Sequence, residues 1–348
     1  LEKFVSGNAE AGSAKMLLAG FYRDAGQEDK AKPLLNTLFS DPAVDVSSKI
    51  IIIGAYNAEL HQNKARNIAD SAKEAFVTSL FEKLVAANPD NVNVHIVGGD
   101  LYLSIKKHRE AQREYVKAVQ MGQVSFEVWE NLLYLETQLE QWDEVLGHAE
   151  EALEMYPNQG LIHYFHGYGL LRKSRYKDAI VSFEQAKKIA ASNPTLVSEI
   201  NTVLGDAYHA TRDYAKSDKA YEEALAHNPN NPIVLNNYSY HLAQRKENLD
   251  KAEKMSSTLI KNNPDSPTFL DTHAWVLYVR QKYREAKKII ERAISTGNAN
   301  ATHLEHYGDI LYQLGDVDGA VKQWEKARGM NAKSEVLIKK IANRKIYE

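Results

Sequence analysis

Two pairs of histidines have a spacing that could bind a metal ion. His163 and His166 are three residues apart, as are His303 and His306, and on a helix this spacing places two imidazoles on one side. No acidic third ligand is fixed near the first pair, and both of its members fall at packing positions of the repeat described below. We therefore expect no metal site, and we expect His306 to lie at the edge of a groove.

Sequence motifs for catalysis are missing. The chain has no Gly-rich phosphate loop of either common type and no His-Glu-x-x-His. It has no cysteine, which excludes disulfides, zinc thiolates and thiol nucleophiles. Serine, histidine and aspartate are present, but a catalytic triad is recognised by geometry, which a sequence does not supply. We therefore expect a protein that is not an enzyme and that uses no cofactor.

Aromatic and acidic side chains recur at helical spacing and predict a binding surface. Tyrosine and tryptophan bury a large area at a low entropy cost, and carboxylates beside them would favour a partner with lysine or arginine. The alternative, that some of these aromatic rings only pack between neighbouring helices, stays open. The candidate partner-binding residues are Tyr134, Tyr164, Tyr168, Asn236, Tyr240, Asp271, Trp275, Tyr278, Glu305, His306, Asp309 and Tyr312.

A repeated pattern places these side chains on helices. Three consecutive copies lie between Pro232 and Ser334, and the last two copies start 34 residues apart. In the last copy, one helix face is marked by Leu304, Tyr307, Gly308 and Leu311, and a second helix face by Ala320, Trp324 and Ala327. A fixed period of this length indicates a solenoid of helix pairs. Seven regular units start near Val92, Phe126, Gly160, Ser198, Pro232, Pro267 and Ala301.

Departures from the period are local. The start-to-start distance is 38 after Gly160, which predicts an added turn around residues 191–196, and 35 after Pro232, which predicts one extra residue in 246–248. A small residue recurs at the eighth place of most units, where it lets two helices approach closely. Asn-Pro and Tyr-Pro pairs are expected to stop the second helices. They stand at 88–89, 156–157, 193–194, 228–229 and 263–264.

The N-terminal part is less regular. A first unit starts near Gly12, and residues 46–91 form a longer unit of 46 residues. Long helices are expected there over residues 47–61 and 65–87. At the other end, residues 335–348 continue the helical period and carry many lysines and arginines, as a solvated cap on the last repeat would.

Composition sets limits on the partner. The 348 residues carry a formal net charge of −3, which predicts no strong nucleic-acid or membrane field. No segment approaches the 18 consecutive apolar residues of a transmembrane helix. The inward-facing places are acidic where an RNA-binding repeat would need basic residues. We therefore expect no nucleic acid and no transmembrane segment, with the oligomeric state left open.

The pattern resembles the tetratricopeptide repeat, a helix-turn-helix unit of 34 residues, from Gly12 to Ser334. The resemblance implies an all-α TPR α-solenoid: a right-handed superhelix of about nine repeats with a C-terminal capping helix. The expected organisation is one continuous solenoid. It comprises N-terminal units over residues 1–91, seven regular units over 92–334 and a cap over 335–348.

The resemblance also implies a non-catalytic scaffold that binds a protein or peptide in its concave groove. The runs Leu235-Asn-Asn-Tyr-Ser-Tyr, Leu270-Asp-Thr-His-Ala-Trp and His306-Tyr-Gly-Asp are similar to the end of bacterial TPR proteins of the cell envelope. This similarity favours an envelope assembly factor in the periplasm over a cytoplasmic protein, with a lipid anchor on a missing upstream segment as one option. The alternative is the non-catalytic TPR region of a larger enzyme or transport machine.

Overall fold

The computed structural model describes residues 5, 12–68, 70–330 and 334–347. In these residues the chain forms helices and no strands, as the repeat pattern predicts. The chain divides into two compact units, residues 1–173 and 174–348, and each is described by itself. The expectation of one continuous superhelix stays a prediction.

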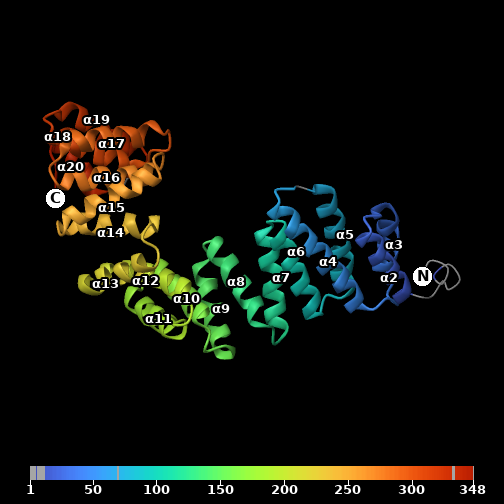
Figure 1. Cartoon of the computed structure of the whole chain (residues 1–348). Coiled ribbons are helices and arrows are strands. Elements are labelled where there is room, and N and C mark those ends of the chain that lie inside the picture. The colour runs from blue at the N-terminus through green and yellow to red at the C-terminus, as the bar shows by residue number, and fades with distance from the viewer. Residues whose placement is uncertain (1–4, 6–11, 69, 331–333, 348) are drawn as a thin grey trace. The chain divides into compact units, whose positions relative to one another are not determined.

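Nine of the described helices lie in the first unit (Figure 1). They are α2 (Gly12–Asp24), α3 (Glu28–Ser40), α4 (Val46–Ala65), α5 (Ser71–Ala87), α6 (Val92–Ser104), α7 (His108–Met121), α8 (Phe126–Gln138), α9 (Trp142–Met155) and α10 (Gly160–Arg172).

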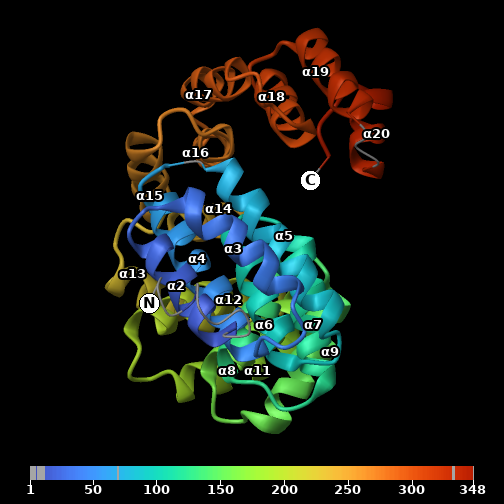
Figure 2. The ribbon, with the colours of Figure 1, turned by 90° about the vertical axis from the view of Figure 1, so that its right-hand side faces the viewer.

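Ten of the described helices lie in the second unit (Figure 2). They are α11 (Tyr176–Ile189), α12 (Pro194–Ala210), α13 (Tyr214–His227), α14 (Pro232–Arg245), α15 (Leu249–Asn262), α16 (Pro267–Val279), α17 (Tyr283–Ser295), α18 (Ala301–Gln313), α19 (Val317–Gly329) and α20 (Glu335–Asn343).

The predicted unit starts coincide with helix starts. Six of the seven regular starts are the first residues of α6, α8, α10, α14, α16 and α18. The exception is α12, which begins at Pro194 and is 17 residues long, so the added turn predicted around 191–196 lies at its start. The pair Asn193–Pro194 therefore does not stop α11, which ends at Ile189. Instead, Asn193 caps α12 and Pro194 occupies its first turn, where a missing N–H costs nothing.

The loop between the two helices of each regular repeat has a residue with positive φ, in the left-handed region, at a fixed place. It is the fifteenth residue of the unit in every regular unit. The unit of 35 residues has two such residues, Lys246 (φ 56°) and Asn248 (φ 45°), which accommodates its extra residue. The residues at the fifteenth place are Lys106, Glu140, Ser174, Arg212, Lys246, Gln281 and Gly315.

The irregular N-terminal unit has long helices with different bounds from those expected. Helix α4 runs for 20 residues to Ala65, and α5 begins only at Ser71. Expected helices over 47–61 and 65–87 are therefore corrected at their junction. The reason is local: Asp70 accepts a hydrogen bond from the backbone N–H of Lys73, which makes it the N-cap of α5.

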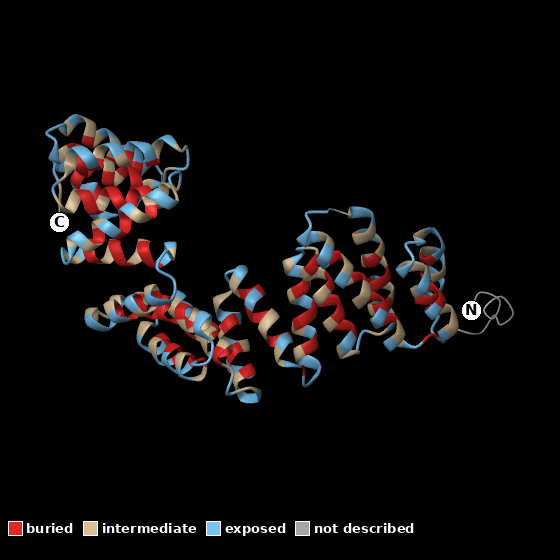
Figure 3. Ribbon diagram, in the orientation of Figure 1, coloured by how far each residue is buried: buried red, intermediate tan, exposed pale blue. Residues whose placement is uncertain are grey.

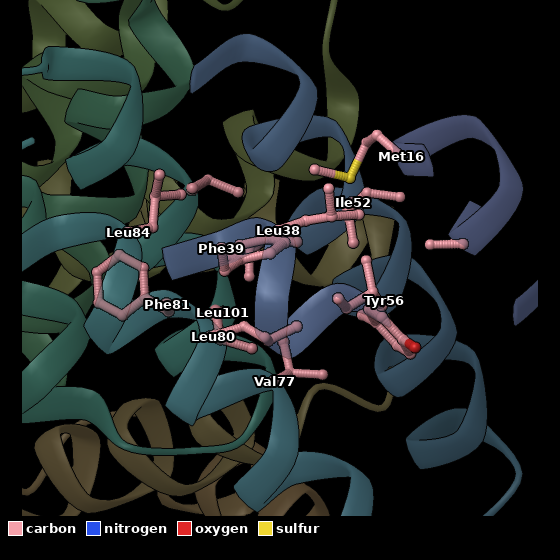
Figure 4. Close-up of a cluster of buried hydrophobic side chains, with 14 of the residues drawn as sticks. Met16, Leu38, Phe39, Ile52, Tyr56, Val77, Leu80, Phe81, Leu84 and Leu101 are labelled. Carbon is pink, nitrogen blue, oxygen red and sulfur yellow. The ribbon is translucent and has the colours of Figure 1, made fainter. Parts of the chain in front are cut away.

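The buried residues are distributed over the helices of both compact units (Figure 3). Figure 4 shows the core of the first unit, in which Tyr56 and Ile52 of α4 lie close to Leu38 and Phe39 of α3. Phe81 of α5 belongs to the same cluster. In this core the helices bury their apolar faces against one another, which is the packing expected of stacked repeats.

Glycine at the eighth place is required by contact. A Cβ built on Gly308 would lie 2.4 Å from Cδ1 of Trp324 and 3.0 Å from the carbonyl oxygen of Ala320. Gly99 and Gly205 face the rings of Tyr115 and Tyr221 in the same way. Small side chains at this place therefore set how closely the two helices of a pair approach.

We expect Gly308→Ala to lower the free energy of unfolding of the last repeat by about 1–3 kcal/mol, because the added methyl overpacks a fully buried indole. Gly54 in α4 is the matched control, since a Cβ there meets nothing within 4 Å. Gly54→Ala should stabilise its helix by roughly 0.5–1 kcal/mol. Hydrogen exchange at the amides of each helix measures both effects, and equal effects at the two sites would contradict the packing argument.

Candidate functional site

A hollow of about 540 Å³ opens in the last repeats of the second unit. We call it the C-terminal hollow. Its walls combine aromatic rings, three glutamine amides and the last described residues of the chain. It is lined by Ala243, Gln244, Lys246, Trp275, Tyr278, Val279, Gln281, Tyr283, Asp309, Gln313, Lys340, Ile346 and Tyr347.

A stack of rings forms the aromatic part of this hollow. The indole of Trp275 is stacked on Tyr278 at 4.8 Å between ring centroids and on His306 at 4.3 Å. Tyr283 of α17 lies 5.5 Å from Tyr278. Trp275 and Tyr278 stand at the ninth and twelfth places of α16, so the helical period brings them to one face. These two predicted rings therefore lie together in the wall of the hollow, and their binding of a partner stays a prediction.

The carboxylates of α18 are already paired with a cation of the chain. Nζ of Lys340, in α20, lies 2.8 Å from Glu305 and 2.8 Å from Asp309. Asp309 also accepts a hydrogen bond of 3.0 Å from the indole N–H of Trp324. Burial raises the pKa of Asp309, and the charge of Lys340 opposes this rise. The structure therefore corrects the expectation that Asp309 waits for a basic partner, because the side chain is buried and matched internally.

A second predicted carboxylate is also matched inside the chain. Asp271 of α16 is buried and lies 2.9 Å from Nδ1 of His306. Burial by itself would lower the pKa of His306, but the charge of Asp271 and this hydrogen bond raise it above its usual value of 6.5. His306 is itself buried. It therefore stacks on Trp275 as a buried residue, and does not edge a groove as the sequence suggested.

The ninth-place aspartates share one structural role. Asp100, Asp206 and Asp309 each accept a hydrogen bond from an aromatic residue fifteen positions later, on the second helix of the same unit. The next helix adds a polar group from its sixth place. Asn237 of α14 donates to Asp206, and Lys340 of α20 binds Asp309. Asp206 and Asp309 therefore join consecutive repeats.

The other predicted residues of the second unit do not line the C-terminal hollow. Asn236 donates a hydrogen bond to Asn237, and burial raises the pKa of the half-buried Tyr240. Tyr312 lies 6.1 Å from the ring of Trp324. A role of Asn236, Tyr240 and Tyr312 in partner binding therefore stays a prediction.

The three predicted tyrosines Tyr134, Tyr164 and Tyr168 belong to the first compact unit, whereas the residues that line the C-terminal hollow belong to the second. Tyr134 of α8 is exposed. Tyr164 is stacked on Tyr168 at 6.1 Å, and Tyr168 packs edge-on against Trp142 at 5.8 Å. The stacked pair therefore forms a separate aromatic surface on α10, within the first unit.

The other three histidines of the two predicted pairs have partners within the chain. Nε2 of His163 lies 3.1 Å from the carbonyl oxygen of Pro157, and the backbone N–H of Asn300 donates to Nδ1 of His303. His166 lies 3.6 Å from a carboxylate oxygen of Glu150. Among the described residues, no group of three or more acidic or histidine side chains could hold a metal ion.

A second hollow, of about 450 Å³, was not anticipated from the sequence. It lies between α2 and α4 and is mostly apolar, with the side chains of Leu17, Phe21 and Ile51 more than half exposed. The sequence held an indication of this hollow, because Gly20 in α2 leaves room where other repeats carry larger residues at the corresponding place.

No described helix is both long and apolar enough to cross a bilayer.

The His306–Asp271 pair predicts a pH dependence. A histidine whose pKa is raised by folding contributes stability that is present below pH 6.5 and is lost as the pH rises through the folded pKa. We expect the amides of α16 and α18 to lose protection as the pH rises above 6.5, after correction for intrinsic exchange. His306→Gln should abolish this loss, whereas His227→Gln, at an exposed histidine of α13, should preserve it. An unchanged profile in His306→Gln would refute the assignment.

Comparisons with known proteins agree with the repeat pattern. Tetratricopeptide repeat family models match residues 198–231 and 272–329. A TPR repeat-containing protein of Methanocaldococcus jannaschii is 23% identical over 291 residues, which cover 69% of this chain. The matched part is 50% of that relative, so the chain spans about half of its length.

Two solved structures are similar in fold. A tetratricopeptide repeat protein from Parabacteroides merdae matches with a TM-score of 0.58 and 16% identity, over 73% of this chain and 98% of that one. A chain of the APC/C Cut9–Hcn1 hetero-tetramer matches with a TM-score of 0.53 and 11% identity, over 96% of this chain and 69% of that one. At these identities the likeness concerns the fold alone.

Proposed function

Because the chain carries tetratricopeptide repeats, a fold typical of scaffolds for protein–protein contacts, we propose that it is a non-catalytic scaffold that binds an extended peptide segment of another protein. The C-terminal hollow is the proposed site. The observation that carries the proposal is the stack of Trp275 and Tyr278 in the wall of a hollow large enough for one or two side chains.

The lining of the hollow indicates which peptide fits. Its aromatic rings offer apolar contact area, and the amides of Gln244, Gln281 and Gln313 can both donate to and accept from a peptide backbone. Its single carboxylate, on Asp309, is paired with Lys340. A peptide that inserts an aromatic or aliphatic side chain therefore fits better than the basic partner predicted from the sequence.

The cellular role extends this proposal. We propose an assembly factor of the bacterial cell envelope, located in the periplasm, on the similarity of the runs that begin at Leu235, Leu270 and His306 to envelope TPR proteins. The net charge of −3 favours a protein partner over a nucleic acid. Fractionation of cells that produce the natural protein would test the location, and recovery in the cytosol would refute it.

Selection of peptides on the full chain tests the binding site. A displayed library of random 12-residue peptides is selected for binding to the immobilised protein, and the enriched peptides are synthesised. Hydrogen exchange with each bound peptide should show new protection in α16, α17 and α18. Protection confined to α2 and α4 would move the site to the first-unit hollow, and the absence of enriched peptides would refute the peptide-binding proposal.

A further inference from the structure

The last repeat holds the short helix α20 on its surface, and the contacts of α20 show which side chains that surface accepts. Helix α20 has nine residues, and only Leu337 and Lys340 are buried. Leu337 packs on the cluster that contains Leu304 and Trp324, and Lys340 binds Glu305 and Asp309. The site therefore accepts one aliphatic and one cationic side chain, three residues apart.

Helix α20 lies where the first helix of a further repeat would begin. Counted from Glu335, Lys340 stands at the sixth place, and it binds the ninth-place carboxylate of the preceding unit. Asn237 at the sixth place of α14 binds Asp206 in the same manner. The surface under α20 is thus continuous with the interface that joins one repeat to the next, which is built to hold helices.

Outside these two side chains, the contacts of α20 with the last repeat are limited to the partly buried Ile341 and to exposed groups. An isolated helix of nine residues is not stable in water, so α20 depends on its docking contacts. Its other ion pair joins Arg344 to the 92% exposed side chain of Asp318, and exposed pairs contribute little. Val336 and Ile338 remain exposed. Segments with so few buried contacts open most readily.

From this geometry we propose that a partner protein docks an amphipathic helix in place of α20. The partner helix presents an aliphatic residue followed three residues later by a lysine. The lysine replaces Lys340 between Glu305 and Asp309, and the aliphatic residue replaces Leu337. The two carboxylates select a cation because Asp309 is buried, and an unpaired buried charge is costly. This proposal does not rest on peptide binding in the C-terminal hollow.

A synthetic peptide with the sequence of residues 334–347 is the probe. It is labelled and titrated into the full-length protein by fluorescence anisotropy. The receptors are the native chain, Leu337→Ala and Lys340→Ala, with Lys339→Ala as the matched control at an exposed lysine of the same helix. Leu337→Ala loosens α20 without leaving a buried charge unpaired, so it tests the site even where Lys340→Ala disturbs the last repeat.

We expect Leu337→Ala and Lys340→Ala to bind the probe at least tenfold more tightly than the native chain, because α20 no longer fills the site. Lys339→Ala should bind like the native chain. A probe with alanine in place of Lys340 should bind at least tenfold more weakly to both opened receptors, and binding of the intact probe should fall as salt increases.

Three results would overturn the proposal. Equal binding to native and opened receptors would show that α20 does not occupy the site. Equal binding of the two probes would show that the site does not select lysine. Formation of a dimer by the Leu337→Ala variant at the concentrations of the titration, detected by light scattering, would assign the site to a second copy of this chain.

Discussion

We expect Lys340→Met to lower the free energy of unfolding of the last repeat by about 3–5 kcal/mol at neutral pH. Removing one partner of a buried ion pair leaves the other charge uncompensated, and Asp309 is only 4% exposed. Methionine keeps most of the length and apolar volume of the lysine, so the loss reports on the charge. Hydrogen exchange at the amides of α18 and α19 measures it.

A second substitution, at Asp309, provides the control. In the double variant Lys340→Met with Asp309→Asn, no buried carboxylate remains at this place, and the amide can still accept from the indole N–H of Trp324. We expect at least half of the lost stability to return. Burial already raises the pKa of Asp309, and loss of Lys340 raises it further. The deficit of the single variant should therefore shrink as the pH is lowered, because Asp309 takes up a proton. A deficit below about 1 kcal/mol at pH 7 would show that the pair is not essential.

The fold was largely predictable because the same pattern of small and large side chains recurs in several repeats. A small residue at Gly308, a large one at Trp324 and a fixed spacing between them describe one close contact, and each further copy confirms the register. The junction of α4 and α5 was not predictable in this way. It depends on the single hydrogen bond of the Asp70 cap, in a unit that has no second copy to compare with.

The candidate site was predictable only in part. The helical period identifies which side chains of α16 share a face with Trp275, but it does not say which charges meet across helices. The pairing of Asp309 with Lys340 joins residues 31 positions apart, and its two ends belong to different structural elements. The one available signal was that Lys340 holds the sixth place of a further unit. Without it, the sequence does not distinguish a carboxylate that has an internal partner from one that awaits a ligand.

The remaining prediction concerns peptide binding in the C-terminal hollow. Trp275→Ala should weaken the binding of selected peptides at least tenfold, since truncation of a central aromatic anchor costs about 2 kcal/mol or more and about 1.4 kcal/mol is tenfold. The indole is half-buried, and its ring contacts are with Tyr278 and His306. The variant should therefore fold, with a local loss of protection confined to α16 and α18.

Tyr312→Ala is the matched control for this variant. Tyr312 is also a half-buried aromatic residue on a first helix, that of the next repeat, but it does not line the hollow. Its replacement should change the affinity less than threefold while costing similar stability. If Trp275→Ala and Tyr312→Ala weaken binding equally per folded molecule, the ring of Trp275 acts only in packing, because an anchor that touches the peptide must cost more than a neighbour that does not.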